Sequence, residues 1–453
     1  MARKFEIDMT NGALLPKIIR FAIPLMLSSL LQLLYNAADV VVVGRFVGDT
    51  ALAAVGSTGS LINLIVNVFM GLSIGTGVLV AQSYGAGDEK RMEKVVHTSI
   101  ALGLIGGLFL TFVGIFLARP MLQLMGSPED VIDQAVLYIR IYFCGMIANL
   151  TYNFGAAVLR SVGDTQRPLY ILAVTGIVNV VLNLILVIFF HFGVAGVAIA
   201  TITAQYLSCI AVLFLLMRAP GSIRFSWKKL QVHPKTLLQM LKVGLPAGLQ
   251  GTIFSISNVL IQSSINSFGS VIVAGSSAAG NLEGFVYVGM NAFYQAALTF
   301  TGQNVGAGKL ERIRRIQFCC IGCVVVVGLI MGVGVYVLGG TLLQLYSTSP
   351  DVIAAGLTRL LYLSVPYFIC GVMDTMVGML RGLGASLVPM CVSVAGVCGV
   401  RIMWILTVFQ VLHTPESLFI SYPISWLATA MTHVLCFEFV FRKFRSRQTT
   451  LAA

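Results

Sequence analysis

Long apolar runs recur from one end of this chain to the other, and they exclude an ordinary water-soluble fold. The first, at residues 21–44, is long enough to cross a bilayer, since a membrane-spanning helix needs about 20 mostly apolar residues. Hydrophobic residues make up 57% of the 453 residues and charged residues only 10%, whereas soluble proteins carry about 25% charged residues. We therefore predict that lipid surrounds much of the protein.

The apolar runs predict an all-α integral membrane protein with twelve spans joined by short connections. Gly and Pro interrupt the runs often, as membrane helices permit where neighbouring helices satisfy the freed backbone groups. The expected spans lie at 17–44, 51–82, 94–118, 131–159, 168–191, 194–217, 237–267, 271–302, 315–340, 352–380, 389–412 and 416–441.

The basic residues predict how these spans are oriented. The net charge is +12, and 24 of the 29 Lys and Arg residues fall in alternate connections, beginning with the N-terminus. Cytoplasmic loops of membrane proteins carry such an excess. We expect a multi-pass protein of the plasma membrane, the inner membrane in a bacterial cell, with both termini in the cytoplasm. This asymmetry explains the positive charge without a nucleic-acid partner.

Short motifs that recur at nearly constant spacing predict an internal duplication. Residues 82–87 (QSYGAG) match 303–308 (QNVGAG), and 159–163 (LRSVG) match 380–384 (LRGLG), both at an offset of 221. Pro24 recurs at an offset of 222, as Pro246. Each copy holds six spans, an even number, so both copies enter the membrane from the same side. Such parallel repeats are a transporter layout in which the substrate path lies between the halves.

The repeat also predicts the domain organisation. We expect a six-helix N-terminal lobe at 1–217 and a six-helix C-terminal lobe at 237–441. The longest basic connection, at 218–236, is the expected cytoplasmic loop between the lobes. A basic cytoplasmic tail at 442–453 completes the chain.

Three acidic residues lie well inside predicted spans: Asp39, Glu283 and Asp374. A carboxylate among apolar helix residues costs roughly 2.5–3.5 kcal/mol on insertion scales, and such residues mark ion or substrate pathways by default. None of the three recurs in the other half, and the equivalent positions are Ile261, Ile62 and Asn153. We therefore expect functional rather than structural roles, above all for Asp39.

Polar residues accompany Asp39 in a pattern that fits a cation site. Tyr35 and Asn36 lie on the same span, and Asn179 and Asn183, four residues apart, share one face of the fifth span. Burial disfavours the charged form of a carboxylate, so this group can hold either a proton or Na⁺. Hard cations take carboxylate and amide oxygens as ligands. The alternative role for the two asparagines is hydrogen bonding between helices.

Arg401 lies near the middle of the eleventh span, too deep to reach the membrane surface easily. We expect it to face the bundle interior and to pair with Glu283 or Asp374, which lie in the same half. Arg140 and Arg359 lie nearer the ends of their spans, where snorkelling of a long side chain to the interface accounts for them.

Pro24 lies in the first span, about four turns from Asp39. Proline removes a helical hydrogen bond and kinks the helix. A kink beside an ionisable group is a candidate hinge, although kinks also occur in membrane helices that do not move.

The motifs occur in order along nearly the whole chain, and they resemble those of the MATE (multidrug and toxic compound extrusion) family. They are YNAADVVVVGRFVG in the first span, AQSYGAGD and GQNVGAGK after the second and eighth, LRSVGDTQRP and LRGLGAS after the fourth and tenth, and YPISW at 422–426. The resemblance is nearest to bacterial NorM- and DinF-like members. It implies efflux coupled to Na⁺ or H⁺ and a V-shaped pair of six-helix lobes.

The resemblance also implies roles for individual residues. In the family, the aspartate of the first span is a coupling-ion site, for Na⁺ or H⁺, joined by polar residues of the fifth and sixth spans. Asp39, Asn179, Asn183 and Thr201 resemble those positions. Some members carry a second acid where this chain has Asn183, a departure that leaves both coupling ions open.

A second candidate site follows from acids of the eighth and tenth spans, which some members use for cation or substrate binding. Glu283 and Asp374 resemble these acids. With Arg401, Tyr35 and Asn36, they form our candidate for a substrate or second cation site.

We therefore predict a secondary antiporter, not an enzyme, that exports amphipathic cationic small molecules while Na⁺ or H⁺ moves inward. It would act as a monomer in the lipid bilayer and need no cofactor besides the coupling ion. The chain has no Walker loop and no nucleophile elbow. One alternative is a lipid-linked precursor flippase, which needs deep cationic residues, and Arg401 is the only clear one. A distant alternative, a membrane-embedded transferase, would need clustered acids or histidines at a membrane face.

Overall fold

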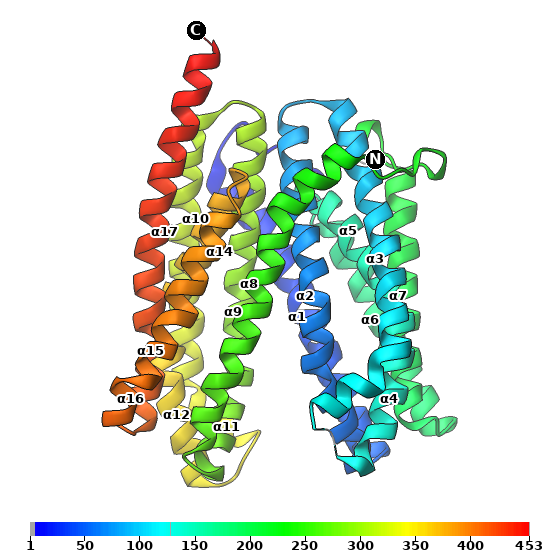
Figure 1. Ribbon diagram of the computed structural model, residues 1–453, viewed down its shortest axis with the longest axis vertical. Coiled ribbons are helices and arrows are strands. Elements are labelled where there is room, and N and C mark those ends of the chain that lie inside the picture. Colours follow the sequence, from blue (N-terminus) through cyan, green and yellow to red (C-terminus); the bar gives the residue numbers. More distant parts are fainter. Residues whose placement is uncertain (1–4, 127, 453) are drawn as a thin grey trace. The chain divides into compact units, whose positions relative to one another are not determined.

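The computed structural model describes residues 5–126 and 128–452, and every regular element in these ranges is a helix (Figure 1). The elements before the central loop are α1 (Leu14–Phe46), α2 (Asp49–Gly85), α3 (Glu89–Leu124), α4 (Glu129–Cys144), α5 (Met146–Ser161), α6 (Gln166–Leu184), the π-helix η2 (Ile185–Phe189) and α7 (Gly193–Met217). The loop holds two short 3₁₀ turns, η3 (Gly221–Ile223) and η4 (Trp227–Lys229).

The second half follows the same plan. Its elements are α8 (Pro234–Asn266), α9 (Ser270–Gly306), α10 (Leu310–Val337), α11 (Gly339–Gln344), α12 (Pro350–Leu363), α13 (Tyr367–Gly382), α14 (Leu387–Ser393), the π-helix η5 (Val394–Gly399), α15 (Val400–Leu406), α16 (Val408–Val411) and α17 (Pro415–Ala452).

The predicted all-α fold with twelve spans is confirmed. Within the described residues, ten helices are long and apolar enough to cross a membrane, and two bent pairs supply the remaining spans. Helices α4 and α5 meet at an angle of 47°, and α12 and α13 meet at 45°. These pairs correspond to the predicted spans 131–159 and 352–380, so the same span is broken in each half.

The duplication seen in the sequence extends to backbone geometry. Helices α2 and α9 both contain 37 residues and begin 221 positions apart. Gly87 and Gly308, which follow these helices, have φ angles of +65° and +69°. This left-handed conformation is one that glycine adopts without steric cost. The recurring glycines therefore mark turns that both halves need.

The chain folds into two compact units whose limits lie inside helices. Among the described residues, the first unit contains 5–8 and Leu27–Gly248, and the second contains Met9–Met26 and 249–452. Helix α1 thus changes unit two residues after Pro24, and α8 changes unit two residues after Pro246. The division by packing therefore differs from the division by repeat, in which the lobes are 1–217 and 237–441.

The loop predicted at 218–236 is held against the first unit. Phe225 is almost fully buried, and the backbone N–H of Ser226 donates to Nε2 of His97 on α3 at 3.1 Å. Lys229 forms an ion pair with Glu93, also on α3, at 2.7 Å. The segment is therefore a packed part of the unit rather than a loose tether.

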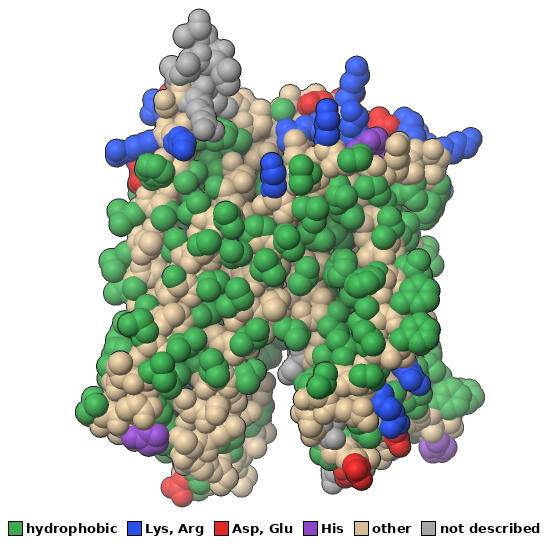
Figure 2. Space-filling model, in the orientation of Figure 1, with side chains coloured by type: hydrophobic (Ala, Val, Ile, Leu, Met, Phe, Trp, Pro, Cys, Tyr) green, Lys and Arg blue, Asp and Glu red, His purple; other side chains and the backbone are tan. Residues whose placement is uncertain are grey.

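The outer faces of the helices are apolar in both units. Figure 2 shows hydrophobic side chains spread along the helices, with most of the visible Lys and Arg side chains near one end of each unit and a few near the other end of one unit. Large exposed residues include Phe116, Val259, Phe318 and Phe439. Soluble proteins rarely expose apolar surface on this scale, so these faces fit contact with lipid.

Candidate ion and substrate sites

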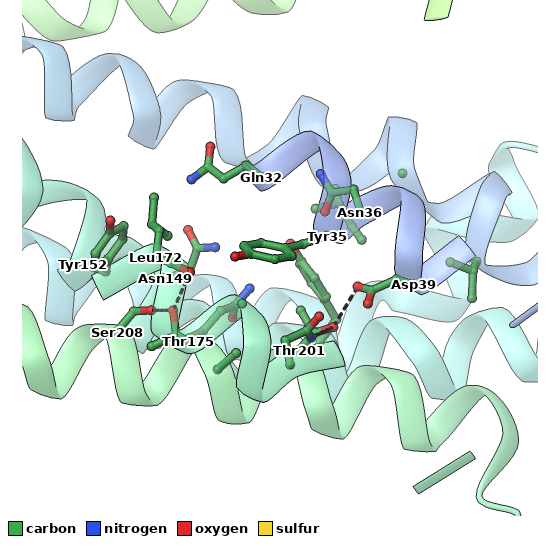
Figure 3. A pocket seen from close by; sticks show the side chains of 18 of the residues that line it. Gln32, Tyr35, Asn36, Asp39, Asn149, Tyr152, Leu172, Thr175, Thr201 and Ser208 are labelled. Carbon is green, nitrogen blue, oxygen red and sulfur yellow. Dashed lines mark hydrogen bonds between the residues drawn. The ribbon is translucent and has the colours of Figure 1, made fainter. Parts of the chain in front are cut away.

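The first unit contains a cavity of about 440 Å³ with many polar side chains in its wall. Helices α1, α2 and α4 to α7 contribute to the lining. Asp39 projects into it from α1, and Thr201 faces it from α7 (Figure 3). Volumes of this size are typical of small-ligand sites.

Asp39 is bound by side chains from two other helices. Its carboxylate accepts a hydrogen bond from Nδ2 of Asn183 on α6 and one from the hydroxyl of Thr201 at 3.3 Å. Nδ2 of Asn179 in turn donates to the Thr201 hydroxyl at 3.4 Å. The structure therefore brings all four predicted cation-site residues into one hydrogen-bonded group.

The charge of Asp39 has no cationic partner among the described residues, because none of their Lys, Arg or His side chains forms an ion pair with it. The Oδ1 atoms of Asn179 and Asn183 are buried and accept no hydrogen bond from the described part of the chain. Buried polar atoms are normally paired. Amide and carboxylate oxygens are the ligand types that a hard cation takes.

Tyr35 and Asn36 line this same cavity, not the one that holds the other members of their predicted set. The Tyr35 hydroxyl donates to the carbonyl oxygen of Ala173 at 3.3 Å. Its ring packs so closely on Gly176 that a Cβ there would lie 1.8 Å from ring atoms. The predicted second site is thus divided, and these two residues belong with Asp39 because α1 beyond Leu27 is part of the first unit.

The second unit contains a cavity of about 410 Å³, and Glu283, Asp374 and Arg401 are among its lining residues. These residues come from α9, α13 and α15 respectively. The prediction that the three lie together therefore agrees with the geometry. Three tyrosines and one tryptophan form part of the same wall, namely Tyr287, Tyr367, Tyr422 and Trp426.

The predicted pairing of Arg401 with an acid is wrong. Glu283 pairs instead with Arg359, whose Nε and Nη2 each donate to one carboxylate oxygen at 2.9 Å. Both side chains are largely buried, so the snorkelling predicted for Arg359 is also wrong. The reason is helix rotation: α12 packs against α9 and turns Arg359 inward. Hydropathy along the sequence does not report which way a single side chain points.

The sequence analysis also missed polar residues of the first cavity. Asn149 and Asn153 line it from α5, and Nδ2 of Asn153 donates to Oδ1 of Asn149 at 2.9 Å. They are four residues apart, the same spacing that drew attention to Asn179 and Asn183. That spacing was the available signal for them.

The fold and the two cavities define a membrane transporter built from a duplicated six-span unit. A family model, MatE, matches residues 24–185 and again 246–407, one match in each repeat. The chain belongs to this family, whose members are the MATE transporters. The prediction made from the motifs is confirmed.

Relatives and solved structures agree with this assignment. The chain is 30% identical to the probable multidrug resistance protein YpnP of Bacillus subtilis, over 84% of this chain and 85% of the relative. It is 24% identical to the probable multidrug resistance protein NorM of Thermotoga maritima, with coverages of 85% and 84%. A MOP superfamily transporter from Pyrococcus furiosus superimposes with a TM-score of 0.90 at 22% identity, with coverages of 96% and 98%.

Proposed function

We propose that the protein is a secondary antiporter that exports amphipathic, positively charged compounds, driven by inward movement of a cation that binds at Asp39. Relatives named as multidrug resistance proteins support the export of drugs or toxic compounds. The observation that carries the proposal is the carboxylate of Asp39, which is buried and has only neutral partners in the described residues.

Such a group responds strongly to cation binding. An unpaired buried charge is costly. A proton or Na⁺ that neutralises the carboxylate therefore removes much of the free-energy cost of burying it. Asn183 and Thr201 reach Asp39 from α6 and α7, and a bound cation would compete with them for its oxygens. A ligand shifts a conformational equilibrium by its differential affinity for the two states. We propose that the cation does so here, with Pro24 as the hinge in α1.

We propose Na⁺ as the coupling ion, because the site offers neutral oxygens besides the carboxylate. The unpaired Oδ1 atoms of Asn179 and Asn183 add two neutral oxygens to the carboxylate of Asp39. Na⁺ would use all of these oxygens, whereas a proton would use the carboxylate alone. We therefore expect a Na⁺ gradient to drive export.

Localisation, topology and oligomeric state are also part of the proposal. The excess of Lys and Arg in alternate connections supports a plasma-membrane protein with both termini in the cytoplasm. We propose that it acts as a monomer, with no enzymatic activity and no cofactor besides the coupling ion.

Dye efflux from proteoliposomes under separate Na⁺ and H⁺ gradients tests the proposal. The purified protein should move an ethidium-like dye when Na⁺ flows down its gradient, and Asp39→Asn should abolish this movement. Asp133→Asn is the matched control, because Asp133 is exposed and pairs with Arg119 on the surface of the same unit. Undiminished efflux by Asp39→Asn would refute the coupling role. Efflux driven by H⁺ alone would refute only the choice of ion.

A further inference from the structure

The cavity of the second unit holds two opposite charges that do not pair with each other. Asp374 and Arg401 both line it. Among the described residues, neither side chain takes part in an ion pair. In the same cavity, Glu283 and Arg359 neutralise one another through two hydrogen bonds. The charges that remain available to a ligand are therefore one carboxylate and one guanidinium.

Arg401 is held in place by neutral groups only. It is 5% exposed, and its Nε donates to the hydroxyl of Ser425 at 2.9 Å. Its guanidinium carbon lies 4.0 Å from the ring centroid of Tyr422 and 5.6 Å from that of Trp426. Aromatic faces attract a cation, but they do not neutralise it. A buried guanidinium ordinarily faces a carboxylate or phosphate that can accept its two parallel N–H groups.

The backbone at Arg401 is also unusual. Only Val400 separates this residue from the end of the π-helix η5 (Val394–Gly399). Interruptions of this kind within α-helices occur frequently at functional sites. A deep arginine beside such an interruption, aimed at a ligand-sized cavity, is therefore better explained by recognition than by lipid contact.

We propose that this cavity binds amphoteric aromatic compounds, with their anionic group at Arg401 and their amine at Asp374. The aromatic body would lie against Tyr287, Tyr367 and Trp426, which line the wall. The cavity volume of about 410 Å³ suits a drug-sized molecule. This inference rests on the proposed function and deepens it, because it adds recognition of a negative group to a cargo otherwise defined by its positive charge.

A pair of probes that differ by one charge tests the proposal. Both have the same aromatic core and amine, but one carries a free carboxylate and the other its methyl ester. Transport into proteoliposomes would be measured against probe concentration under the driving gradient, for the unchanged protein and for variants. Arg401→Gln removes the charge, and Arg401→Lys keeps the charge but loses the two-pronged geometry. Arg140→Gln is the matched control, since Arg140 is exposed in the first unit.

We expect Arg401→Gln to raise the KM for the carboxylate probe about tenfold, the size expected for losing one hydrogen bond to a charged group. The KM for the ester should change less than about twofold, since the ester makes no charged contact there. Arg401→Lys should fall between the unchanged protein and Arg401→Gln for the carboxylate probe. Arg140→Gln should leave both values unchanged. Asp374→Asn should raise both, because both probes carry the amine.

Equal losses for the two probes in Arg401→Gln would overturn the proposal and assign Arg401 a structural role. Transport of the ester but not the carboxylate by the unchanged protein would overturn it too, while the proposed function would stand. If neither probe nor the ethidium-like dye moved under any gradient, the proposed function would fail as well. Should Arg401→Gln not fold, Arg401→Lys provides the same comparison between probes.

Discussion

The two units share a backbone plan, but their cavities contain different charged groups. In the first, Asp39 is the one acid among the described residues that line the cavity, and its described hydrogen-bond partners are neutral. In the second, two acids and two arginines line one cavity. At the repeat offset of 221, Arg359 corresponds to Tyr138 and Tyr422 corresponds to Thr201, and all four line a cavity.

This difference shows which properties the duplication preserved. The length shared by α2 and α9, the bend between α4 and α5, and the glycine turns recur, because these features depend on apolar length and on a few backbone positions. The charged groups that line the cavities do not recur. The function of each cavity must therefore be argued from its own side chains, and an acid in one unit need not have the role of an acid in the other.

Removing one acid from each unit gives the strongest test of this difference between an unpaired and a paired carboxylate. Glu283→Gln leaves Arg359 buried without its partner, which typically costs about 3–5 kcal/mol of stability. Asp39→Asn removes a charge that has no cationic partner and should cost far less, although it stops transport. Thermal unfolding of the purified protein in detergent measures both.

A double variant serves as the control for this prediction. Glu283→Gln combined with Arg359→Gln removes both charges, so it should recover much of the stability lost by Glu283→Gln alone. If Asp39→Asn and Glu283→Gln destabilised the protein equally, the distinction between a lone carboxylate and a paired one would be lost.

A smaller effect tests the shared backbone plan. Gly87 and Gly308 have nearly equal positive φ angles, and a Cβ at either position would meet no atom within 4 Å. Alanine should therefore cost about 1–2 kcal/mol at each position, from backbone strain alone. The two variants should shift the unfolding temperature by similar amounts. A large difference would mean that the turns of the two units are not equivalent.

Gly163 gives the contrasting case within the first unit. Its φ is +92°, and a Cβ there would lie 2.6 Å from the backbone nitrogen of Ile7. Gly163→Ala therefore adds a backbone clash to the strain and should cost more than Gly87→Ala. The same unfolding measurement compares them, and equal costs would show that the segment around Ile7 moves aside easily.

The sequence was sufficient for the spans and the repeat, because apolar length and motif spacing are properties of the chain itself. It was also sufficient to place Asn179 and Asn183 on one face, since residues four apart on a helix are neighbours. Thr201 came only from the resemblance to a family. The ion pair between Glu283 and Arg359 was not predictable, because it depends on how two helices distant in the sequence rotate against each other.

The placement of Tyr35 and Asn36 failed for a related reason. Helix α1 belongs to one unit before Leu27 and to the other after it. No composition change in the sequence marks this point, although Pro24 lies close to it. Residues on one continuous span were therefore assigned to a cavity that the span does not reach.

The smallest predicted effect concerns the equivalent positions Thr201 and Tyr422, where the same backbone site serves different chemistry. The Thr201 hydroxyl has one proton and two acceptors within reach, Asp39 Oδ2 at 3.3 Å and the Val197 carbonyl oxygen at 3.0 Å. Thr201→Val should therefore weaken the binding of the coupling ion only moderately, by about 1 kcal/mol. This corresponds to a roughly fivefold rise in the half-saturating Na⁺ concentration. The measurement is dye efflux against Na⁺ concentration.

Two control variants complete this test. Thr203→Val should change nothing, because the Thr203 hydroxyl donates only to the Ile199 carbonyl oxygen of its own helix. Tyr422→Phe should also have almost no effect on dye efflux, since the ring face, not the hydroxyl, contacts Arg401. A hydroxyl would then matter at this position in the first unit and an aromatic face in the second. If Tyr422→Phe impaired transport more than Thr201→Val, the hydroxyl of Tyr422 would have to act in the second cavity, and the proposed contrast between the units would be wrong there.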